Sequence, residues 1–264
     1  MIPDISHYQV LPQGFSGADP KIFLTYQDQH YMLKLPRTKT KFIPTHLSEH
    51  IACAIAGKLG YAVQHTQLVT YHGQEGVLVT LFDQDLVTFT GLGVSTLTHQ
   101  NLQYDLDLIM TTLSDTKFEL GLSGYIWETF LFDAFILNLD RHPNNWGFFK
   151  GQKYEPAPLF DLGNSLYSIN YTSLHKMDDL ERYIHRFSNS SIKYKAEKCS
   201  FREIIVQEKH QALKPFLSAF VTGLVSLDIT DVLQEVLMLN PEHQAYCHFI
   251  SRLLEVQIQW YQNL

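Results

Sequence analysis

The sequence predicts an α+β protein with two lobes, a small β-rich N-terminal lobe over residues 1–83 and a larger helical C-terminal lobe over residues 84–264. Two observations predict this fold class. Short runs typical of strands dominate the first part of the chain, and longer segments with helical periodicity dominate the rest. With 264 residues, of which 45% are hydrophobic and 18% charged, the chain can bury a large core.

The N-terminal lobe is predicted to contain four strands and one helix. Residues 21–26 and 30–35 alternate in hydrophobicity and form a predicted hairpin. A helix is predicted over 47–59, because Ile51, Ile55 and Leu59 recur on one face and Gly60 follows as a C-terminal cap. Further strands are predicted over 62–70 and 76–82.

The C-terminal lobe is predicted to be helical around a short β insert. Helices are expected over 102–113 and 123–138, and strands over 146–150 and 154–159. Three more helices, over 212–225, 229–239 and 244–262, are expected to pack as a terminal bundle. Because no long linker separates independent domains, the two lobes are expected to form one domain with a ligand cleft.

Composition excludes several classes of protein. Lys and Arg total 20 against 27 Asp and Glu, a net charge of −7, which argues against a nucleic-acid-binding surface as the main function. Cys53, Cys199 and Cys247 are scattered and odd in number, which fits a reducing compartment. No signal peptide is expected, and the most apolar stretch, 124–139, is interrupted by Glu128 and Asp133 and is too short to span a membrane. We expect a cytoplasmic protein, with export lacking a cleavable signal still open.

The run from 137 to 147, LNLDRHPNNWG, is the most informative part of the sequence. Asp140 and Asn145 lie five residues apart on a loop between a buried helix and a strand, and Asp161 and Gly163 follow another strand. Phosphoryl transfer needs a carboxylate to align the attacking hydroxyl and oxygen ligands to hold Mg²⁺ on the phosphates of ATP. We therefore predict Asp140 as the catalytic residue and Asn145 and Asp161 as metal ligands. The alternative is a polar turn around a buried arginine.

An ATP-binding lysine is expected in the N-terminal lobe. Lys34 lies in an apolar strand, where a charge is costly unless it is paired. Glu49, early in the following helix, is its predicted partner, as in the pair with which kinases hold ATP phosphates. The alternative places Lys34 on the solvent face of an edge strand.

Two weaker elements complete the predicted nucleotide site. Gly14 and Gly17 offer a short glycine-containing phosphate loop, and Ser16 between them is a candidate autophosphorylation site or an ordinary turn serine. The segment from Leu81 through Phe82 to Asp83 connects the predicted lobes, and its backbone is expected to contact the adenine.

One further group, His243 with Cys247 and His248, has the donor atoms of a metal site. His243 and Cys247 share a face at helical spacing, but no second ligand pair follows, so a helix surface is the interpretation favoured by the sequence.

The motifs assembled above resemble the kinase core of the HipA-like Ser/Thr kinase family of bacterial toxin–antitoxin modules. The run NLDRHPNNWG resembles the family's catalytic loop, SGADPK over 16–21 its phosphate loop, and Ser48-Glu49-His50 its early helix motif. The chain is most similar to compact, HipT-like or CtkA-like members. It departs from the family at 161–164, where DLGN replaces a frequent Asp-x-x-Pro turn.

The resemblance implies a bilobal protein-kinase-like fold, with ATP and Mg²⁺ as cofactors and transfer of the γ-phosphate to a Ser or Thr hydroxyl of a protein substrate. It also implies an antitoxin as a possible partner, without direct nucleic-acid binding or membrane insertion. Two alternatives stay open. The order Asp-Arg-His-x-x-Asn is similar to the catalytic loop of phosphoinositide kinases, which implies a lipid substrate. The chain could also be a catalytically weak pseudokinase that acts as a binding module.

Overall fold

The computed structural model describes residues 1–12, 21–36, 43–83, 85–91, 104–112, 122–168, 180–187, 192–195 and 197–264. The chain forms two compact units. Unit 1 comprises Met1–Asp83, Phe160–Met177 and Leu227–Leu253, and unit 2 comprises Gln84–Leu159, Asp178–Ser226 and Leu254–Leu264. The predicted lobe boundary is one of the points at which the chain leaves unit 1, but two later segments return to this unit.

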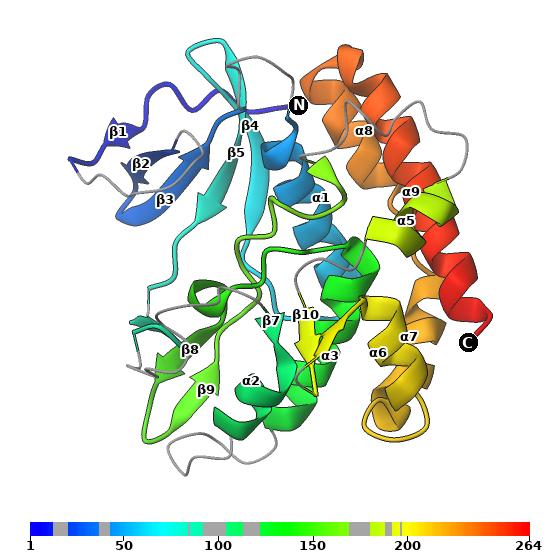
Figure 1. Cartoon of the computed structure of the whole chain (residues 1–264). Coiled ribbons are helices and arrows are strands. Elements are labelled where there is room, and N and C mark those ends of the chain that lie inside the picture. The colour runs from blue at the N-terminus through cyan, green and yellow to red at the C-terminus, as the bar shows by residue number, and fades with distance from the viewer. Residues whose placement is uncertain are drawn as a thin grey trace. The chain divides into compact units, whose positions relative to one another are not determined.

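Unit 1 contains a five-stranded antiparallel sheet with the order β1-β2-β3-β5-β4 (Figure 1). Its strands are β1 (Gln9–Val10), β2 (Lys21–Tyr26), β3 (Gln29–Lys34), β4 (Thr66–Tyr71) and β5 (Gln74–Thr80). The predicted hairpin is formed by β2 and β3. Because β3 lies between β2 and β5, Lys34 is not on an edge strand, and that alternative is wrong.

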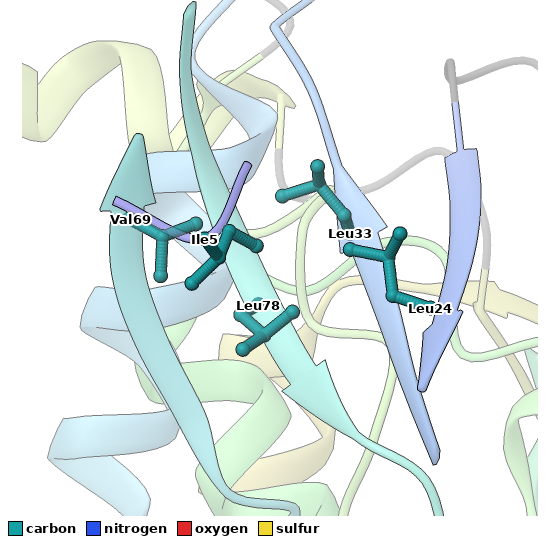
Figure 2. Close-up of a cluster of buried hydrophobic side chains, with 5 residues drawn as sticks. All are labelled: Ile5, Leu24, Leu33, Val69 and Leu78. Carbon is teal, nitrogen blue, oxygen red and sulfur yellow. The ribbon is translucent and has the colours of Figure 1, made fainter. Parts of the chain in front are cut away.

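One face of this sheet carries a hydrophobic cluster (Figure 2). Neighbouring strands each contribute a buried aliphatic side chain, and the N-terminal segment adds one more, giving Ile5, Leu24, Leu33, Val69 and Leu78. Burial of each such side chain contributes roughly 1.5–3 kcal/mol to folding. Because successive side chains of a strand point to opposite faces, Lys34 lies on the other face of the sheet from Leu33.

Helix α1 (Thr45–Lys58) contacts β4 and β5, and it also contacts α8 (Thr230–Leu239) (Figure 1). Ile51 and Ile55 are fully buried, as their spacing predicts. Polar residues of the same helix are buried as well, because α1 is covered on more than one side. The helix ends where predicted, since Gly60 follows with a φ of 84°, a conformation that suits glycine.

Unit 2 contains two three-stranded sheets. The first has the order β6-β8-β9, from β6 (Leu86–Thr88), β8 (Gly147–Lys150) and β9 (Tyr154–Pro156). The second has the order β11-β10-β7, from β7 (Tyr104–Asp105), β10 (Ile192–Tyr194) and β11 (Glu197–Cys199). The predicted β insert corresponds to β8 and β9.

Helix α3 (Leu122–Ile136) is buried along most of its length. The other helical elements described in unit 2 include α2 (Leu106–Thr112), the 3-10 turn η2 (Pro143–Asn145), α5 (Leu180–Phe187), α6 (Phe201–Glu208) and α7 (Lys214–Val225). Two of these helices, α6 and α7, contact α3. Among the described residues, no single helix is both long and apolar enough to cross a membrane.

The predicted C-terminal bundle is present in part. The last helix contacts α7 through the rings of Tyr261 and Phe220, whose centroids lie 5.4 Å apart. It contacts α8 through the Cys247 thiol, 3.8 Å from the carbonyl of Leu233. The other two helices also have partners outside the bundle. Helix α7 packs on α3 in unit 2, whereas α8 packs on α1 and β4 in unit 1. The 3-10 turn η4 (Pro241–His243) belongs to unit 1, and α9 (Gln244–Gln262) contributes to both units. The apolar faces of these helices therefore cover partners distant in the sequence, which helical periodicity alone does not identify.

Candidate active site

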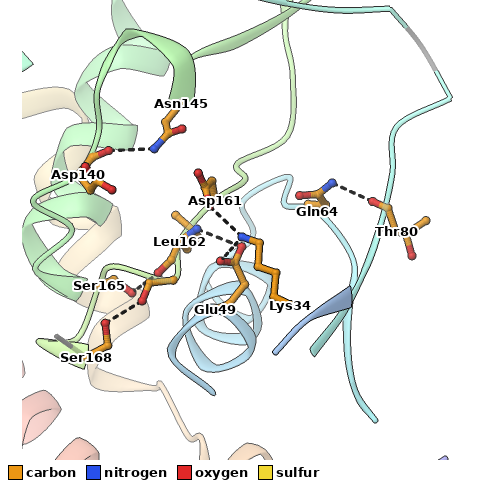
Figure 3. Close-up of polar contacts among 11 residues, drawn as sticks. Lys34, Glu49, Gln64, Thr80, Asp140, Asn145, Asp161, Leu162, Ser165 and Ser168 are labelled. Carbon is orange, nitrogen blue, oxygen red and sulfur yellow. Dashed lines mark hydrogen bonds and ion pairs between the residues drawn. The ribbon is translucent and has the colours of Figure 1, made fainter. Parts of the chain in front are cut away.

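Lys34 lies at the centre of a buried ion-pair cluster within unit 1 (Figure 3). Its Nζ lies 2.7 Å from Oε2 of Glu49 and 2.8 Å from Oδ1 of Asp161. Burial alone would lower the pKa of Lys34, but the charges of Glu49 and Asp161 outweigh it and hold the pKa well above its usual range. The end of β3 thus presents a fixed ammonium group between two carboxylates.

The Glu49 carboxylate joins this lysine to the turn that carries Asp161. It is fully buried, and its Oε1 accepts a hydrogen bond of 3.1 Å from the backbone N–H of Leu162. The next residue, Gly163, approaches so closely that an added Cβ would lie 2.9 Å from Oε2 of Glu49. The predicted pairing of Lys34 with Glu49 is therefore present, and the glycine is needed for close contact.

The turn that begins at Asp161 is held in a specific conformation. Asp161 has a φ of 55°, which is unusual for a residue other than glycine and is often found where function fixes the backbone. The hydroxyl of Ser165 donates to the carbonyl of Leu162 at 2.7 Å, and that of Ser168 donates to the carbonyl of Gly163 at 2.8 Å (Figure 3). The Asp161 side chain is 44% exposed, so its carboxylate remains accessible to solvent.

In unit 2, the predicted catalytic loop starts directly after α3. Leu137 has a φ of 55°, and the N–H of Asn138 donates to the carbonyl of Asp133 at 2.9 Å, as in a Schellman motif. Arg141 then returns to the helix, where its Nε and one terminal nitrogen bind both carboxylate oxygens of Asp133 at 2.9 and 2.8 Å. This bidentate pair is buried, so a strong charged contact fixes Arg141, in the middle of the loop, to helix α3.

The same arginine positions Asn145. Its second terminal nitrogen donates to the carbonyl of Asn145 at 2.8 Å, and its guanidinium lies 5.6 Å from the centre of the Trp146 ring. The Asn145 side-chain nitrogen donates to the backbone carbonyl of Asp140 at 2.9 Å (Figure 3). This bond fixes the orientation of the Asn145 amide, whose oxygen is the atom that can bind a cation.

The donor groups in both units suit magnesium chemistry. Asp161 supplies an accessible carboxylate and Asn145 an oriented amide oxygen, and Mg²⁺ prefers oxygen ligands of these kinds. The carboxylate of Asp140 lies on the same loop as Asn145, in a half-buried position. The structure thus brings Lys34, Glu49 and Asp161 together in unit 1, and Asp140 and Asn145 together in unit 2.

The structure describes the segment from Leu81 to Asp83 but not the predicted phosphate loop. The N–H of Leu81 donates to the carbonyl of His30 at 3.0 Å, so this N–H is already used within unit 1, and the adenine contacts of Leu81, Phe82 and Asp83 stay a prediction. The ring of Phe82 lies edge-on to Phe160, with centroids 6.1 Å apart. The predicted phosphate-loop residues Gly14, Ser16 and Gly17 lie outside the described residues.

Sequence reasoning missed the residues that support the site. In the sequence, Asp133 interrupts an apolar helix, and a buried carboxylate needs a cationic partner. Arg141, eight positions later, is that partner. The capping box at the start of α6, in which Ser200 and Glu203 exchange hydrogen bonds, was also missed despite its visible S-x-x-E pattern.

A sheet with a buried Lys–Glu pair, an Asp/Asn loop after a buried helix, and a downstream aspartate together define a protein-kinase-like fold. The sequence model of the HipA-like C-terminal domain matches residues 14–215. The chain therefore belongs to the HipA-like family.

Two comparisons with named proteins agree with this assignment. The serine/threonine-protein kinase CtkA of Helicobacter pylori is 26% identical over 273 residues, which cover 93% of this chain and 82% of the relative. The crystal structure of the H. pylori proinflammatory kinase CtkA matches with a TM-score of 0.81 and 25% identity, over 97% of this chain and 94% of that chain. The predicted fold class is confirmed by this structural match.

A more distant structure shares the fold. HipA of Shewanella oneidensis, solved in complex with HipB and operator DNA, matches with a TM-score of 0.62 and 14% identity. The match covers 96% of this chain and 67% of HipA.

Proposed function

We propose that the chain is an ATP- and Mg²⁺-dependent serine/threonine protein kinase. The observation that carries this proposal is the buried Lys34 ammonium, held between Glu49 and Asp161 at 2.7 and 2.8 Å. A lysine in such a setting can bind ATP phosphates while remaining charged, and its glutamate fixes where the charge lies. Membership of the HipA-like family and the likeness to CtkA support the same activity.

In this proposal Lys34 contacts the phosphates of ATP, and Glu49 positions it. Asp161 and the amide oxygen of Asn145 would hold Mg²⁺, which when bound neutralises phosphate charge and orients the γ-phosphoryl group. Asp140 accepts a hydrogen bond from the substrate hydroxyl, aligns it for in-line attack and takes up its proton. The fixed loop lowers the cost of this alignment because little reorganisation is needed during reaction.

The proposal is tested by measuring transfer of the labelled γ-phosphate of ATP to protein in the presence of Mg²⁺. Asp140→Asn should reduce the rate by a factor of about 10² or more, the usual contribution of general acid–base catalysis. Asp28→Asn provides the matched control, because Asp28 makes the same carboxylate-to-amide change on an exposed turn. Transfer by Asp140→Asn at nearly the wild-type rate would remove Asp140 from the mechanism.

The same assay separates the alternative activities. Phosphoinositide turnover that exceeds turnover on every protein tested would favour a lipid kinase. Nucleotide binding without any transfer by the wild type would favour a pseudokinase that acts as a binding module. Phosphopeptide mapping of the wild type, with Ser16→Ala as the control, tests autophosphorylation of the predicted phosphate loop.

A protein partner of the antitoxin kind is part of the proposal. The support is the HipA neighbour, which is solved in complex with HipB. Co-purification of the tagged chain with the product of an adjacent gene tests this point, and inhibition of phosphate transfer by that product is the expected result. A co-purified product that leaves the rate of transfer unchanged would contradict an antitoxin role.

A further inference from the structure

A second polar cluster lies in unit 1, formed by His46, Glu75 and His243. His46 is in the first turn of α1, Glu75 is the second residue of β5, and His243 is the last residue of η4. Nε2 of His46 lies 3.3 Å from one carboxylate oxygen of Glu75, and Nε2 of His243 lies 2.9 Å from the other. One ligand atom from each residue can be chosen so that all three atoms lie within 4.8 Å of one another.

The two distances from the histidines to Glu75 are close to those of a tetrahedral metal site. With metal–ligand bonds of about 2.0–2.1 Å, neighbouring ligand atoms lie about 3.3 Å apart. Small shifts of the three side chains would therefore place all of them around one ion. Two imidazoles and one carboxylate, with an open fourth position for water, form a donor set that suits zinc and related transition metals.

The three side chains lie in a largely buried environment. Both histidines are buried, at 0% and 6% exposed for His46 and His243. Glu75 is half-buried, so the two buried imidazoles converge on a carboxylate that is partly shielded from solvent.

An open cavity borders this cluster at Glu75. The cavity has a volume of about 570 Å³, and both Glu75 and Asn240 are among its lining residues. The side-chain nitrogen of Asn240 also lies 3.4 Å from Oε2 of Glu75, where it can orient the carboxylate. The cavity therefore offers an ion a route to the Glu75 carboxylate and has room for water beside it.

We propose that His46, Glu75 and His243 form a binding site for a divalent transition-metal ion of the zinc class. The site is distinct from the proposed Mg²⁺ ligands, because imidazole nitrogens suit zinc and Mg²⁺ prefers oxygen. A bound ion would connect the start of α1, strand β5 and the turn η4, which are far apart in the sequence. Glu49 lies three residues after His46 on α1, so the same ion would stabilise the helix that holds Lys34.

Of the group His243, Cys247 and His248 noted in the sequence, only one residue belongs to the proposed site. His243 contributes to the proposed site, whereas the Cys247 thiol contacts the carbonyl of Leu233 at 3.8 Å. His248 is exposed on α9. The other two ligands come from positions 46 and 75, which the local spacing around residue 243 does not indicate.

The test is equilibrium dialysis of the chelator-treated full chain against ZnCl₂, followed by metal analysis and thermal melting. The wild type should bind one Zn²⁺ per chain and show a raised Tm, and excess Mg²⁺ should not displace the ion. His243→Gln and Glu75→Gln should weaken binding at least about 100-fold, because loss of even an outer-shell partner commonly costs 10–100-fold. His248→Gln, an exposed histidine five positions from His243, should bind as the wild type does.

Two results would overturn the proposal. One is the absence of a stoichiometric Zn²⁺ site in the wild type, and the other is equal affinity in the wild type and His243→Gln. Should the variants fail to fold, the wild type still decides the matter through Co²⁺ binding, which should give the strong visible bands of a four-coordinate site. Absence of these bands in a folded chain would contradict the site, whatever the kinase assay shows.

Discussion

Replacement of Lys34 by methionine tests whether the ion-pair cluster in unit 1 is as buried as the structure indicates. The substitution removes the ammonium that lies 2.7 Å from the fully buried Glu49 carboxylate. Loss of one partner of a buried pair typically costs about 3–5 kcal/mol, because the other charge is left uncompensated. The contact with Asp161 adds little to this figure, since that side chain is 44% exposed and screened by solvent.

The expected loss for Lys34→Met is therefore about 3–5 kcal/mol in the free energy of unfolding, measured by urea denaturation at pH 7. Glu49→Gln should cost less, about 1.5–3 kcal/mol, because Lys34 keeps Asp161 as a partner. The double variant should be more stable than the sum of the two losses predicts, since neither buried charge remains. A loss below about 1 kcal/mol for Lys34→Met would refute the reasoning and place the lysine in solvent.

Three further predictions follow from individual contacts. Gly163→Ala should lower the free energy of unfolding by about 1–3 kcal/mol and reduce ATP affinity, because the added Cβ would lie 2.9 Å from Oε2 of Glu49. Unchanged unfolding and ATP-binding curves would contradict that close approach. Asp133→Asn should lower the free energy of unfolding by about 3–5 kcal/mol in urea denaturation, because it leaves the buried Arg141 without its charged partner. A loss as small as that typical of a surface ion pair would contradict the burial of this pair. Burial lowers the pKa of His50 below its unfolded value of about 6.5, so the unfolded state binds more protons and stability should fall as the pH drops below that value. His50→Gln should flatten this decline between about pH 7 and pH 5, and an unchanged slope of Tm against pH would contradict it.

Much of unit 1 could be predicted because its signals are local. The alternating hydrophobicity around 21–35 gave the hairpin, and Gly60 marked the end of α1. Lys34 and Glu49 could be paired from the sequence alone, since a lysine in an apolar strand requires a buried carboxylate.

The errors and omissions concern long-range packing. Helices α7 and α8 are adjacent in the sequence but cover different partners, α3 and α1, and their apolar faces do not specify which. Glu75 and His243 are separated by most of the chain, so their contact at 2.9 Å depends on the docking of η4 beside β5. The positive φ of Asp161 was likewise not predictable, because it follows from the contacts of Leu162 and Gly163 with Glu49 and α1.

Thermal melting with and without Mg-ATP, on the wild type and on Asp161→Asn, tests the central claim most directly. Ligand at about 100 times its dissociation constant should stabilise the wild type by about 2.7 kcal/mol, a rise of about 5 °C or more in Tm. The rise should require Mg²⁺ and should be lost in Asp161→Asn, because the accessible carboxylate beside Lys34 is removed. A wild type whose Tm does not change at millimolar Mg-ATP, or an equal rise in Asp161→Asn, would contradict the assignment of this cluster as the nucleotide phosphate site.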